Sequence, residues 1–433
     1  MNIVCKLSEA DDFVIDSHFI EYNVNNSGQY TYTFWSKESI KKLINLPNFI
    51  SNIGLDFLYI SLFVFGADRI SDRNSTYDSW TRVYNLYIPV LELDKWNNNK
   101  ELLEQMLNYL SGDKWNIIFR SREYTQMEIR AREKYKKRSV EKELDVKKIC
   151  MFSGGLDSFI GAIDALEECC DNVLFVSHYG GGKGVKEYQD LLKAKLYKKY
   201  TVNEDQFFSF HAAARDGKED TTRTRSFMFF CHAIALATSI NTSIELLIPE
   251  NGLISLNIPL TNSRLGSSST RTTHPYYLDM LQTLIQKLGL SISIRNPYQF
   301  KTKGEMILEC KNMNFLKRNI SNTMSCSHPD HGRMLGEKEA CHCGNCLPCV
   351  IRRAAILKSG FKDYTVYRDI DFKSGETAKV NFNSYMLGLN KYQEKTAFLS
   401  VQKSGPIKAD IDKYAQIYIR GMEELGEVLN RIK

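Results

Sequence analysis

Short apolar runs alternate with longer amphipathic segments between about residue 146 and residue 312. The runs are rich in apolar and β-branched side chains, as strands are, and cover residues 148–152, 172–179, 206–211, 244–248 and 291–294. The longer segments repeat apolar residues with a helical period and cover residues 158–168, 185–200, 224–240, 276–288 and 303–312. This alternation predicts an α/β fold in which a parallel sheet carries helices on both faces.

The N-terminal part of the chain has a mixed pattern. Residues 29–35, 57–65 and 80–90 are rich in aromatic and β-branched residues, which predicts strands. Residues 37–46 and 100–110 have the spacing of amphipathic helices. We therefore expect an α+β domain here, in which no catalytic motif is recognisable.

These patterns divide the chain into five parts. We expect an α+β N-terminal domain (residues 1–129), a basic linker (130–147), an α/β domain (148–325), a cysteine-rich segment (326–358) and a C-terminal helical extension (359–433). The linker is rich in Lys and Arg, which is typical of a solvated charged segment and also of a segment that grips RNA or an acidic partner.

Composition limits the class of protein. The 433 residues are 43% hydrophobic and 25% charged, which is ordinary for a globular chain and excludes a disordered or fibrous one. No run approaches the ~18–20 apolar residues that cross a bilayer, and the first residues lack the order of a signal peptide. We therefore expect a cytoplasmic protein. The net charge of +6 suits a phosphate-bearing ligand without requiring a nucleic acid.

The first predicted strand of the α/β domain ends in a glycine-containing turn that leads directly into a helix. Two glycines let the backbone approach a ligand closely, and the helix start offers unpaired N–H groups to an anion. Two hydroxyls and a carboxylate suited to Mg²⁺ accompany them. A strand-to-helix turn with glycine also has a purely structural explanation. The residues of this candidate phosphate loop are Ser153, Gly154, Gly155, Leu156, Asp157 and Ser158.

Five of the eleven cysteines lie close together in the sequence. Cys-x-x-Cys steps let sulfurs reach one ion from a single turn, and four thiolates complete a closed tetrahedral zinc site of structural type. An iron–sulfur cluster is the alternative. The spacing favours Cys326, Cys343, Cys346 and Cys349 as ligands, with Cys341 and His342 near enough to replace one of them.

The hexapeptide SGGLDS resembles the pyrophosphate loop of the PP-loop ATPases. The Ser325-Cys326 pair, the CGNCLPC motif with Arg352, and the lysine-bearing segment around Lys303 narrow the resemblance to the QueC family. It implies a PP-loop fold of the HUP type, Rossmann-like, with ATP, Mg²⁺ and Zn²⁺ as cofactors. It also implies that Arg223 and Arg225 face the triphosphate, and that Asp157, Arg225 and Lys303 are catalytic.

The chain departs from the QueC pattern in residues 249–275, and the segment between Cys326 and Cys343 is longer. These departures, together with the long N-terminal part, resemble the QueC-like proteins of antiphage operons, in type IV CBASS and Qat systems. Amide and carboxylate side chains in residues 249–275 can form hydrogen bonds with the edge of a guanine-like base. A cation and an imidazole in the same segment can act beside the substrate carboxylate that is activated. We expect substrate contacts from Glu250, Asn251, Asn257 and Arg271, and catalytic roles for Arg271 and His274. A polar loop with local caps is the alternative for part of this segment.

The resemblance implies a ligase that adenylates 7-carboxy-7-deazaguanine and passes the acyl group to an amine, on a partner protein from the same defence operon. Three other functions stay open. They are the synthesis of 7-cyano-7-deazaguanine with ammonia, the modification of tRNA, and a non-catalytic role as a docking subunit.

Overall fold

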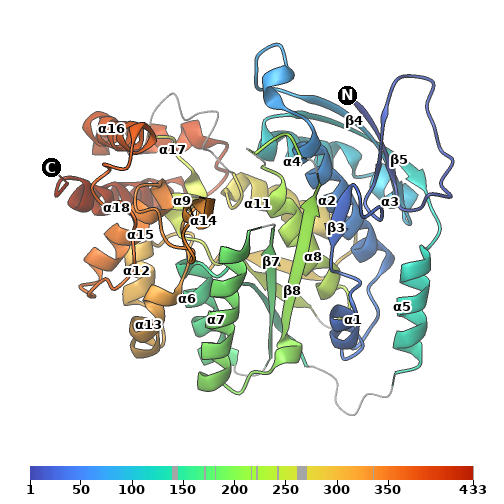
Figure 1. Ribbon diagram of the computed structural model, residues 1–433, viewed down its shortest axis with the longest axis horizontal. Helices are drawn as coiled ribbons and strands as arrows, with labels where there is room; N and C mark the ends of the chain where they lie inside the picture. The colour runs from blue at the N-terminus through green and yellow to red at the C-terminus, as the bar shows by residue number, and fades with distance from the viewer. Residues whose placement is uncertain are drawn as a thin grey trace.

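The computed structural model describes residues 1–432 except 139–144, 170–171, 181, 216, 221–222, 241–242, 261–270 and 335. Two sheets and the helices around them form the molecule (Figure 1). Among the described residues, no helix is long and apolar enough to cross a membrane.

The larger sheet confirms the predicted parallel α/β fold. Its strand order is β10-β9-β6-β7-β8-β3, and the first five of these strands run parallel. The order along the chain reverses at β6, which has β7 on one side and β9 on the other, and ligands bind at such switch points in open α/β sheets. The parallel strands are β6 (Lys148–Met151), β7 (Val173–Tyr179), β8 (Phe207–Ala214), β9 (Ile244–Leu247) and β10 (Ile292–Arg295).

Helices cover both faces of this sheet because its strands are apolar on both sides. In β6, Ile149 and Met151 belong to one hydrophobic core, whereas Cys150 belongs to the other. The Cys150 face is covered by α6 (Leu156–Cys169), α7 (Lys183–Lys199), α12 (Lys303–Leu308), α13 (Met313–Asn319) and α15 (Leu347–Lys358). The Ile149 face is covered by α2 (Asn52–Ile70), α8 (Arg225–Ala237) and α11 (Pro275–Lys287).

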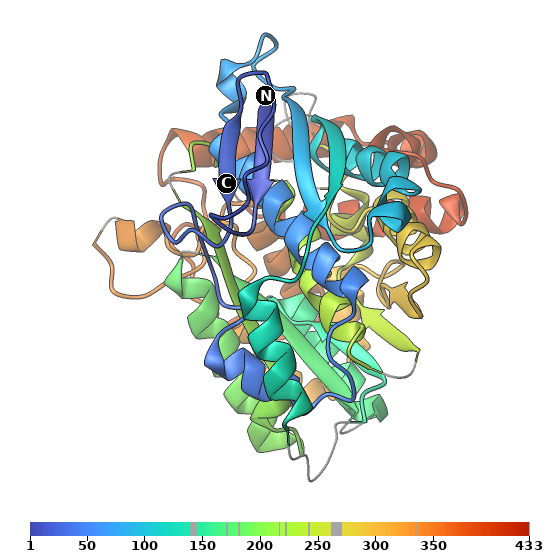
Figure 2. The ribbon, with the colours of Figure 1, turned by 90° about the vertical axis from the view of Figure 1, so that its right-hand side faces the viewer.

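The N-terminal part forms a second sheet of order β2-β1-β4-β5, seen at the top of Figure 2. Its strands are β1 (Asn2–Lys6), β2 (Ile20–Asn23), β4 (Val83–Val90) and β5 (Lys114–Ser121). All three pairings are parallel. Besides α2, the N-terminal part contains the helices α1 (Lys37–Leu43), α3 (Leu93–Asn97), α4 (Lys100–Ser111) and α5 (Gln126–Lys136), the last of which includes the start of the basic segment.

Two of the strands predicted in this part differ from the structure. Residues 57–65 lie inside helix α2, so the strand prediction was wrong. Helix α2 is buried on nearly all sides between the two sheets, so it has no polar face that would reveal a helical period. Residues 29–35 contribute only β3 (Tyr30–Tyr32), which joins the larger sheet antiparallel to β8.

The two sheets share one hydrophobic core, because α2 and α8 pack together between them. This core includes Ile3 and Leu86 of the N-terminal sheet and Ile149 and Phe210 of the larger one. The N-terminal part is therefore packed against the α/β part over an extended apolar interface.

The C-terminal helices α16 (Glu376–Lys391), α17 (Ala397–Ser404) and α18 (Ile411–Leu429) form a third core with α15 and the short helix α9 (Gly252–Leu256). The predicted apolar stripe of the last helix is buried in this core, at Tyr414, Tyr418, Met422, Leu425 and Leu429. The C-terminal extension thus packs against the segments that follow β9 and β10, because its core includes Leu256 of α9, and Tyr414 and Arg420 of α18 donate to Gln299 and Phe300.

Candidate functional site

The candidate phosphate loop lies in the turn between β6 and α6, at the switch point of the sheet. Gly154 has φ +84°, a left-handed conformation that glycine adopts at least cost. A Cβ at this position would lie 2.9 Å from Cγ of Gln189, so the turn has no room for a side chain. Both constraints explain why the chain has glycine here.

Hydroxyl and amide groups gather inside this turn. Ser153 Oγ donates to Ser158 Oγ over 3.0 Å, and Ser158 Oγ donates to the Gly155 carbonyl over 2.9 Å. The amide of Leu156 points to Ser325 Oγ at 3.4 Å, which brings the Ser325-Cys326 pair against the loop. The first amides of α6 have no partner within the helix, and the helix dipole is positive at this end. The turn can therefore bind an anion such as a phosphate.

Asp157, in the first turn of α6, is the centre of a buried polar cluster. Its carboxylate lies 2.9 Å from Lys303 Nζ. It also accepts two hydrogen bonds from Asn251, from the backbone amide over 3.1 Å and from Nδ2 over 2.7 Å. Glu250 shares a further side-chain hydrogen bond with Asp157. We call Asp157, Glu250 and Lys303 the carboxylate–lysine cluster.

The cluster contains two carboxyl groups and one lysine. The lysine can balance the charge of only one carboxylate. Removal from water and the charge of Asp157 raise the pKa of Glu250 well above its usual range. Burial acts in the same direction on Asp157, but the Lys303 ammonium and the hydrogen bonds outweigh it and lower the pKa of Asp157. The geometry therefore favours the negative charge on Asp157 and the proton on Glu250, which donates it in a hydrogen bond to Asp157.

Lys303 is fixed by the start of helix α12. Thr302 caps this helix and forms a capping box with Glu305. The Thr302 hydroxyl also donates to the carboxylate of Glu424, a residue of α18. The C-terminal extension therefore supports the turn that presents Lys303 to Asp157.

Arg225 stands at the first position of α8, on the same edge of the sheet as the loop. Its Nε donates to Nδ1 of His178 over 3.4 Å, at the end of β7. Burial and the charge of Arg225 hold the pKa of His178 well below its usual range, so its imidazole is neutral and can accept this bond. Gln189 donates from Nε2 to the carbonyls of His178 and Ser153, at 3.1 Å each. Arg225 and the loop are thus joined through His178 and Gln189.

The structure does not bring Arg223 and Arg271 to the loop. The Arg223 guanidinium lies over the Trp80 ring, 4.6 Å from its centroid, and its pKa is lowered to about 10 by burial and by neighbouring arginines. Arg271 donates to the carbonyl of Tyr109 over 2.9 Å and lies over that ring. Both side chains point to the N-terminal part, so nothing in this geometry supports the predicted ATP contact of Arg223 or the predicted substrate contact and catalytic role of Arg271.

His274 is the N-cap of α11. Its Nδ1 accepts from the Tyr276 amide over 3.2 Å, and its Nε2 lies 3.1 Å from the Ser404 hydroxyl. Burial and the charge of Arg271 lower its pKa to about 3. Because both ring nitrogens are engaged, this arrangement offers no free lone pair for the base role predicted for His274.

Of the predicted substrate residues, Asn251 and Asn257 lie at the two ends of α9. Asn251 caps its start, accepting from the Ile254 amide over 3.0 Å, while its Nδ2 is held by Asp157. Asn257 ends it in a left-handed conformation and lines a cavity of about 410 Å³. Residues 261–270, part of the segment 249–275 in which the sequence departs from the QueC pattern, lie outside the described residues.

Two segments connect this cavity, which we call the zinc-side cavity, to the phosphate loop. Ser327 and His328 line it and follow directly after Ser325 and Cys326. Helix α9 connects it to Asn251 and so to Asp157. Its wall is mainly apolar and is completed by side chains of the C-terminal helices, namely Thr377, Asn381, Tyr385, Tyr418 and Leu425. An apolar cavity with a few polar groups suits a small planar ligand.

The four predicted cysteine ligands come together beside this cavity. All four sulfur atoms lie within 4.8 Å of one another, and the pairs Cys326–Cys346 and Cys343–Cys349 are each 3.9 Å apart. A tetrahedron with metal–sulfur bonds of ~2.3 Å has sulfur–sulfur edges of ~3.8 Å. The cluster can therefore hold one zinc ion, whereas an iron–sulfur cluster would need more widely spaced sulfurs.

Backbone amides near the four cysteines support a zinc site. The amides of Cys343 and Cys346 donate to the sulfurs of Cys326 and Cys343, each over 3.3 Å, which stabilises thiolates. Gly344 has φ +88°, and a Cβ there would lie 2.2 Å from the Asp369 carbonyl oxygen. The CGNC turn thus needs its glycine.

Cys341 and His342 lie outside the group of four. Cys341 accepts from Arg368 over 3.3 Å, and His342 Nε2 lies 3.0 Å from the Thr323 carbonyl. Arg352 is fully buried and donates to the Thr323 hydroxyl and the Ile320 carbonyl, each over 2.5 Å. Arg352 therefore fixes the segment that leads to Ser325 rather than a ligand.

A family model matches part of the chain. Residues 272–360 match the model of the queuosine biosynthesis protein QueC. This match supports a QueC-like family and an ATP-utilising enzyme of the PP-loop class. A comparison with curated proteins gives no match. The matched residues include Lys303 and all four clustered cysteines but not the loop, and the structure joins the two parts through the contact between Lys303 and Asp157.

Several residues that position the site gave no signal in the sequence. Gln189 lies in the middle of α7, and Asn296 follows β10 and binds the backbone of Glu250 through both its Oδ1 and its Nδ2. Asp68 of α2 caps α8, accepting from the amides of Arg223 and Thr224. These contacts join segments that are far apart in the sequence, so a spacing rule could not have found them.

Proposed function

We propose that this chain is an ATP-dependent ligase that adenylates the carboxylate of a 7-carboxy-7-deazaguanine-type substrate and transfers the acyl group to an amine. The observation that carries the proposal is the contact of Lys303, from the segment matched to QueC, with Asp157 of the phosphate loop. A loop that can bind phosphate, a buried cation and an adjoining apolar cavity supply the parts that adenylation needs.

In this proposal the loop amides and Arg225 bind the triphosphate, and the zinc-side cavity takes the heterocycle of the substrate. The substrate carboxylate then attacks the α-phosphorus, a new P–O bond forms, and the bond to pyrophosphate breaks. An amine attacks the acyl carbon of the mixed anhydride, and AMP leaves with its electron pair. Lys303 stabilises the negative charge on the phosphoryl oxygens during the first step.

Asp157 would hold Mg²⁺, which neutralises charge on the phosphates when bound. Its carboxylate is the ionised one of the cluster, so the donor fits such an ion. The remaining roles belong to the chain itself: Asn251 orients Asp157, and the protonated Glu250 donates to it. The zinc site stabilises the segment between the loop and the cavity.

The proposal has two forms, which differ in the amine that accepts the acyl group. The departures in residues 249–275 resemble antiphage QueC-like proteins, which favours an amine on a partner protein in phage defence. The match to the QueC model favours ammonia, with formation of the nitrile.

The test combines the purified protein with ATP, Mg²⁺ and 7-carboxy-7-deazaguanine. AMP and pyrophosphate should form with the wild type and not with Asp157→Ala. The formation of neither product by a folded, zinc-loaded wild type would overturn the proposal. Adding ammonium and finding 7-cyano-7-deazaguanine by mass spectrometry would identify ammonia as acceptor, whereas a mass increase of a co-expressed partner would identify a protein amine.

A further inference from the structure

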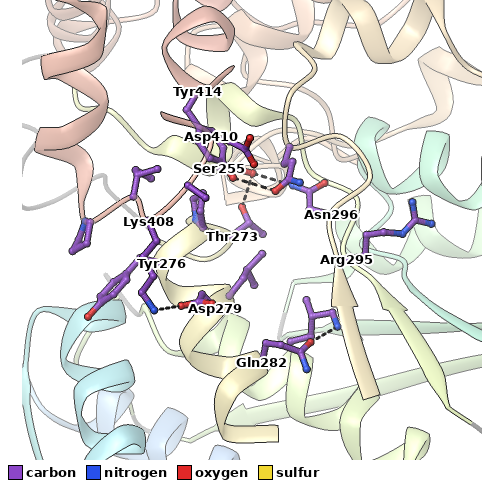
Figure 3. A pocket seen from close by; sticks show the side chains of 17 residues that line it. Ser255, Thr273, Tyr276, Asp279, Gln282, Arg295, Asn296, Lys408, Asp410 and Tyr414 are labelled. Carbon is purple, nitrogen blue, oxygen red and sulfur yellow. Dashed lines mark hydrogen bonds and ion pairs between the residues drawn. The ribbon is translucent and has the colours of Figure 1, made fainter. Parts of the chain in front are cut away.

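Two of the cavities that lie outside the proposed catalytic site differ in charge. The first, of about 330 Å³, lies at the end of β10, and its lining includes the acidic Asp279 and Asp410 and the basic Arg295 and Lys408 (Figure 3). The second, of about 360 Å³, lies between α7 and α13, and four of the six residues that line it are basic. The second cavity therefore has an excess of positive charge that the first does not have.

We call the second cavity the basic groove. The end of α7 and helix α13 form its walls, and they pack together through the rings of Tyr200 and Phe315, whose centroids lie 5.8 Å apart. Phe315 and Asn319 are buried, whereas three of the four cations are exposed and therefore accessible to a ligand. The groove is lined by Lys195, Lys198, Lys199, Phe315, Arg318 and Asn319.

The four cations of the groove lack acidic partners. Lys193, on the same helix, pairs with Glu204. In the described part of the chain, none of the four groove cations forms such a pair. Glu167 of α6 accepts a hydrogen bond from Tyr200, the residue after Lys199, and can offset at most one of the four charges. Most of the positive charge of the groove therefore has no counterpart within the protein.

The helix ends explain only part of this charge. Lys198 and Lys199 lie in the last turn of α7, and Arg318 lies in the last turn of α13, where cations offset the negative end of the helix dipole. Each dipole end corresponds to roughly half an elementary charge, so the two ends offset about one of the four cations. Holding the remaining like charges close together costs free energy, and a bound anion would remove that cost.

The basic groove lies at the opposite edge of the larger sheet from the phosphate loop. The loop follows the carboxyl end of β6, and β6, β7 and β8 run parallel. Helix α7 instead ends near the amino end of β8, because Lys193 lies over the ring of Phe207, the first residue of that strand (Figure 1). The groove is therefore separate from the ATP site, and neither the proposed reaction nor the match to QueC assigns it a role.

Two aromatic side chains extend the surface beside α13. Phe361 lies against this helix, because Lys317 Nζ is 5.3 Å from the centroid of its ring. Tyr364 is 67% exposed, and Lys362 lies over its ring at 5.0 Å. A groove of cations with aromatic rings beside it is typical of surfaces that bind single-stranded nucleic acids, because the cations contact the phosphates and the bases stack on the rings.

We propose that the basic groove binds the phosphodiester backbone of a single-stranded nucleic acid, whose bases stack on Phe361 and Tyr364. Three of the four cations are lysines, which bind phosphates as point charges, whereas the fork of an arginine is the typical partner of a carboxylate. An acidic protein segment would also leave the two rings without a planar partner. The observations therefore favour a nucleic acid.

The test is a titration of labelled oligo(dT) and oligo(U), each about 12 nucleotides long, with the full chain, followed by fluorescence anisotropy at several salt concentrations. The groove variant combines Lys198→Ala with Arg318→Ala and removes one exposed cation from each wall. The matched control combines Lys391→Ala with Lys403→Ala, which removes two exposed cations from the last turns of α16 and α17. Tyr364→Ala removes the exposed ring without changing the charge.

We expect the wild type and the matched control to bind at least one of the two oligonucleotides with equal affinity. The groove variant should bind it at least tenfold more weakly, and the slope of log Kd against log salt concentration should fall by ~1.4, since each phosphate contact contributes ~0.7. Tyr364→Ala should weaken binding by ~5-fold or more and leave the slope unchanged. A preference for one oligonucleotide identifies the ligand as DNA or RNA.

Absence of binding by the wild type, or equal binding by the groove variant, would overturn the proposal. Unchanged binding by Tyr364→Ala would do the same, as would equal competition by a poly-glutamate peptide of the same charge, because the surface would then recognise charge alone. The titration requires no ATP turnover, so its outcome is independent of the proposed function.

Discussion

Two clusters of acidic and basic side chains, one in each half of the molecule, differ in the balance of their charges. The N-terminal cluster joins Asp68 and Asp113 to Arg73 and Arg82, all of them almost completely buried. The carboxylate–lysine cluster joins Asp157 and Glu250 to Lys303 beside the phosphate loop.

The N-terminal cluster is balanced. Arg82 donates to both aspartates, and Arg73 donates to Asp113 through both of its Nη atoms, at 2.9 and 3.0 Å. The second oxygen of Asp68 caps α8. Each carboxylate therefore has a cation and further donors, which is the condition under which buried charge is tolerated.

The carboxylate–lysine cluster has one cation for two carboxyl groups, and burial together with the charge of Asp157 raises the pKa of Glu250 and favours its neutral form. An additional cation beside the carboxylate–lysine cluster would favour ionisation of Glu250, whereas each carboxylate of the N-terminal cluster already has a cation. The difference indicates that the balanced N-terminal cluster stabilises the fold. The carboxylate–lysine cluster, which has fewer cations than carboxyl groups, lies at the candidate binding site.

The largest effect is expected from Asp113→Ala in the balanced cluster. The variant leaves two buried arginines short of a partner, so the free energy of unfolding should fall by ~3–5 kcal/mol. Urea denaturation followed by circular dichroism measures this. Asp220→Ala is the control, since Asp220 is exposed and pairs with Arg69, and it should change stability by less than ~1 kcal/mol. Equal effects of the two variants would contradict the comparison.

Lys303→Met should reduce ATP turnover by ~10²–10³-fold, because a buried cation aimed at developing phosphoryl charge is lost. The rate of pyrophosphate release at saturating ATP measures this. Lys301→Met removes a lysine that is partly exposed and pairs with Glu309, so its rate should remain within ~2-fold of wild type. A Lys303→Met protein that is folded and fully active would disprove the role of the cluster.

Glu250→Gln should change the pH dependence of stability. The pKa of Glu250 is raised in the folded state, so the unfolded chain loses this proton first, and wild-type stability should fall as pH rises above the ordinary carboxyl value of ~4.3. Glutamine has no ionisable proton, so Glu250→Gln should remove this decrease in stability with rising pH. Denaturation at several pH values measures it, and parallel curves for the two proteins would show that Glu250 ionises normally.

The smallest effect is expected from His274→Asn. Asparagine can replace the imidazole as an N-cap acceptor, and the imidazole is neutral at working pH because its pKa is about 3. Turnover should change by no more than ~3-fold, and its pH profile should keep its shape. A large loss of turnover with an altered profile would restore the base role predicted from the sequence.

The sequence was most informative where the chemistry is local. The glycines, serines and Asp157 of the loop are consecutive, and three of the four clustered cysteines lie within seven residues, so their geometry follows from one turn each. The parallel sheet was predictable because both faces of its strands are apolar.

The sequence was least informative where distant segments meet. Arg223 was predicted to face the triphosphate and His274 to act as a base, but Asp68 and Trp80 hold Arg223 elsewhere, and Ser404 holds His274. Helix α2 was mistaken for a strand because complete burial removes the polar face. The zinc-side cavity gave no signal in the sequence, because side chains of the C-terminal extension complete its wall.

The central claim is that a carboxylate attacks the α-phosphorus of ATP at the loop. It is tested by supplying a 7-carboxy-7-deazaguanine whose carboxylate carries oxygen-18, together with ATP, Mg²⁺ and an amine, and by analysing the nucleotide product by mass spectrometry. The account predicts AMP that carries one oxygen-18 atom from the carboxylate, formed by the wild type and not by Lys303→Met. Unlabelled AMP, or ADP in place of AMP, would contradict it.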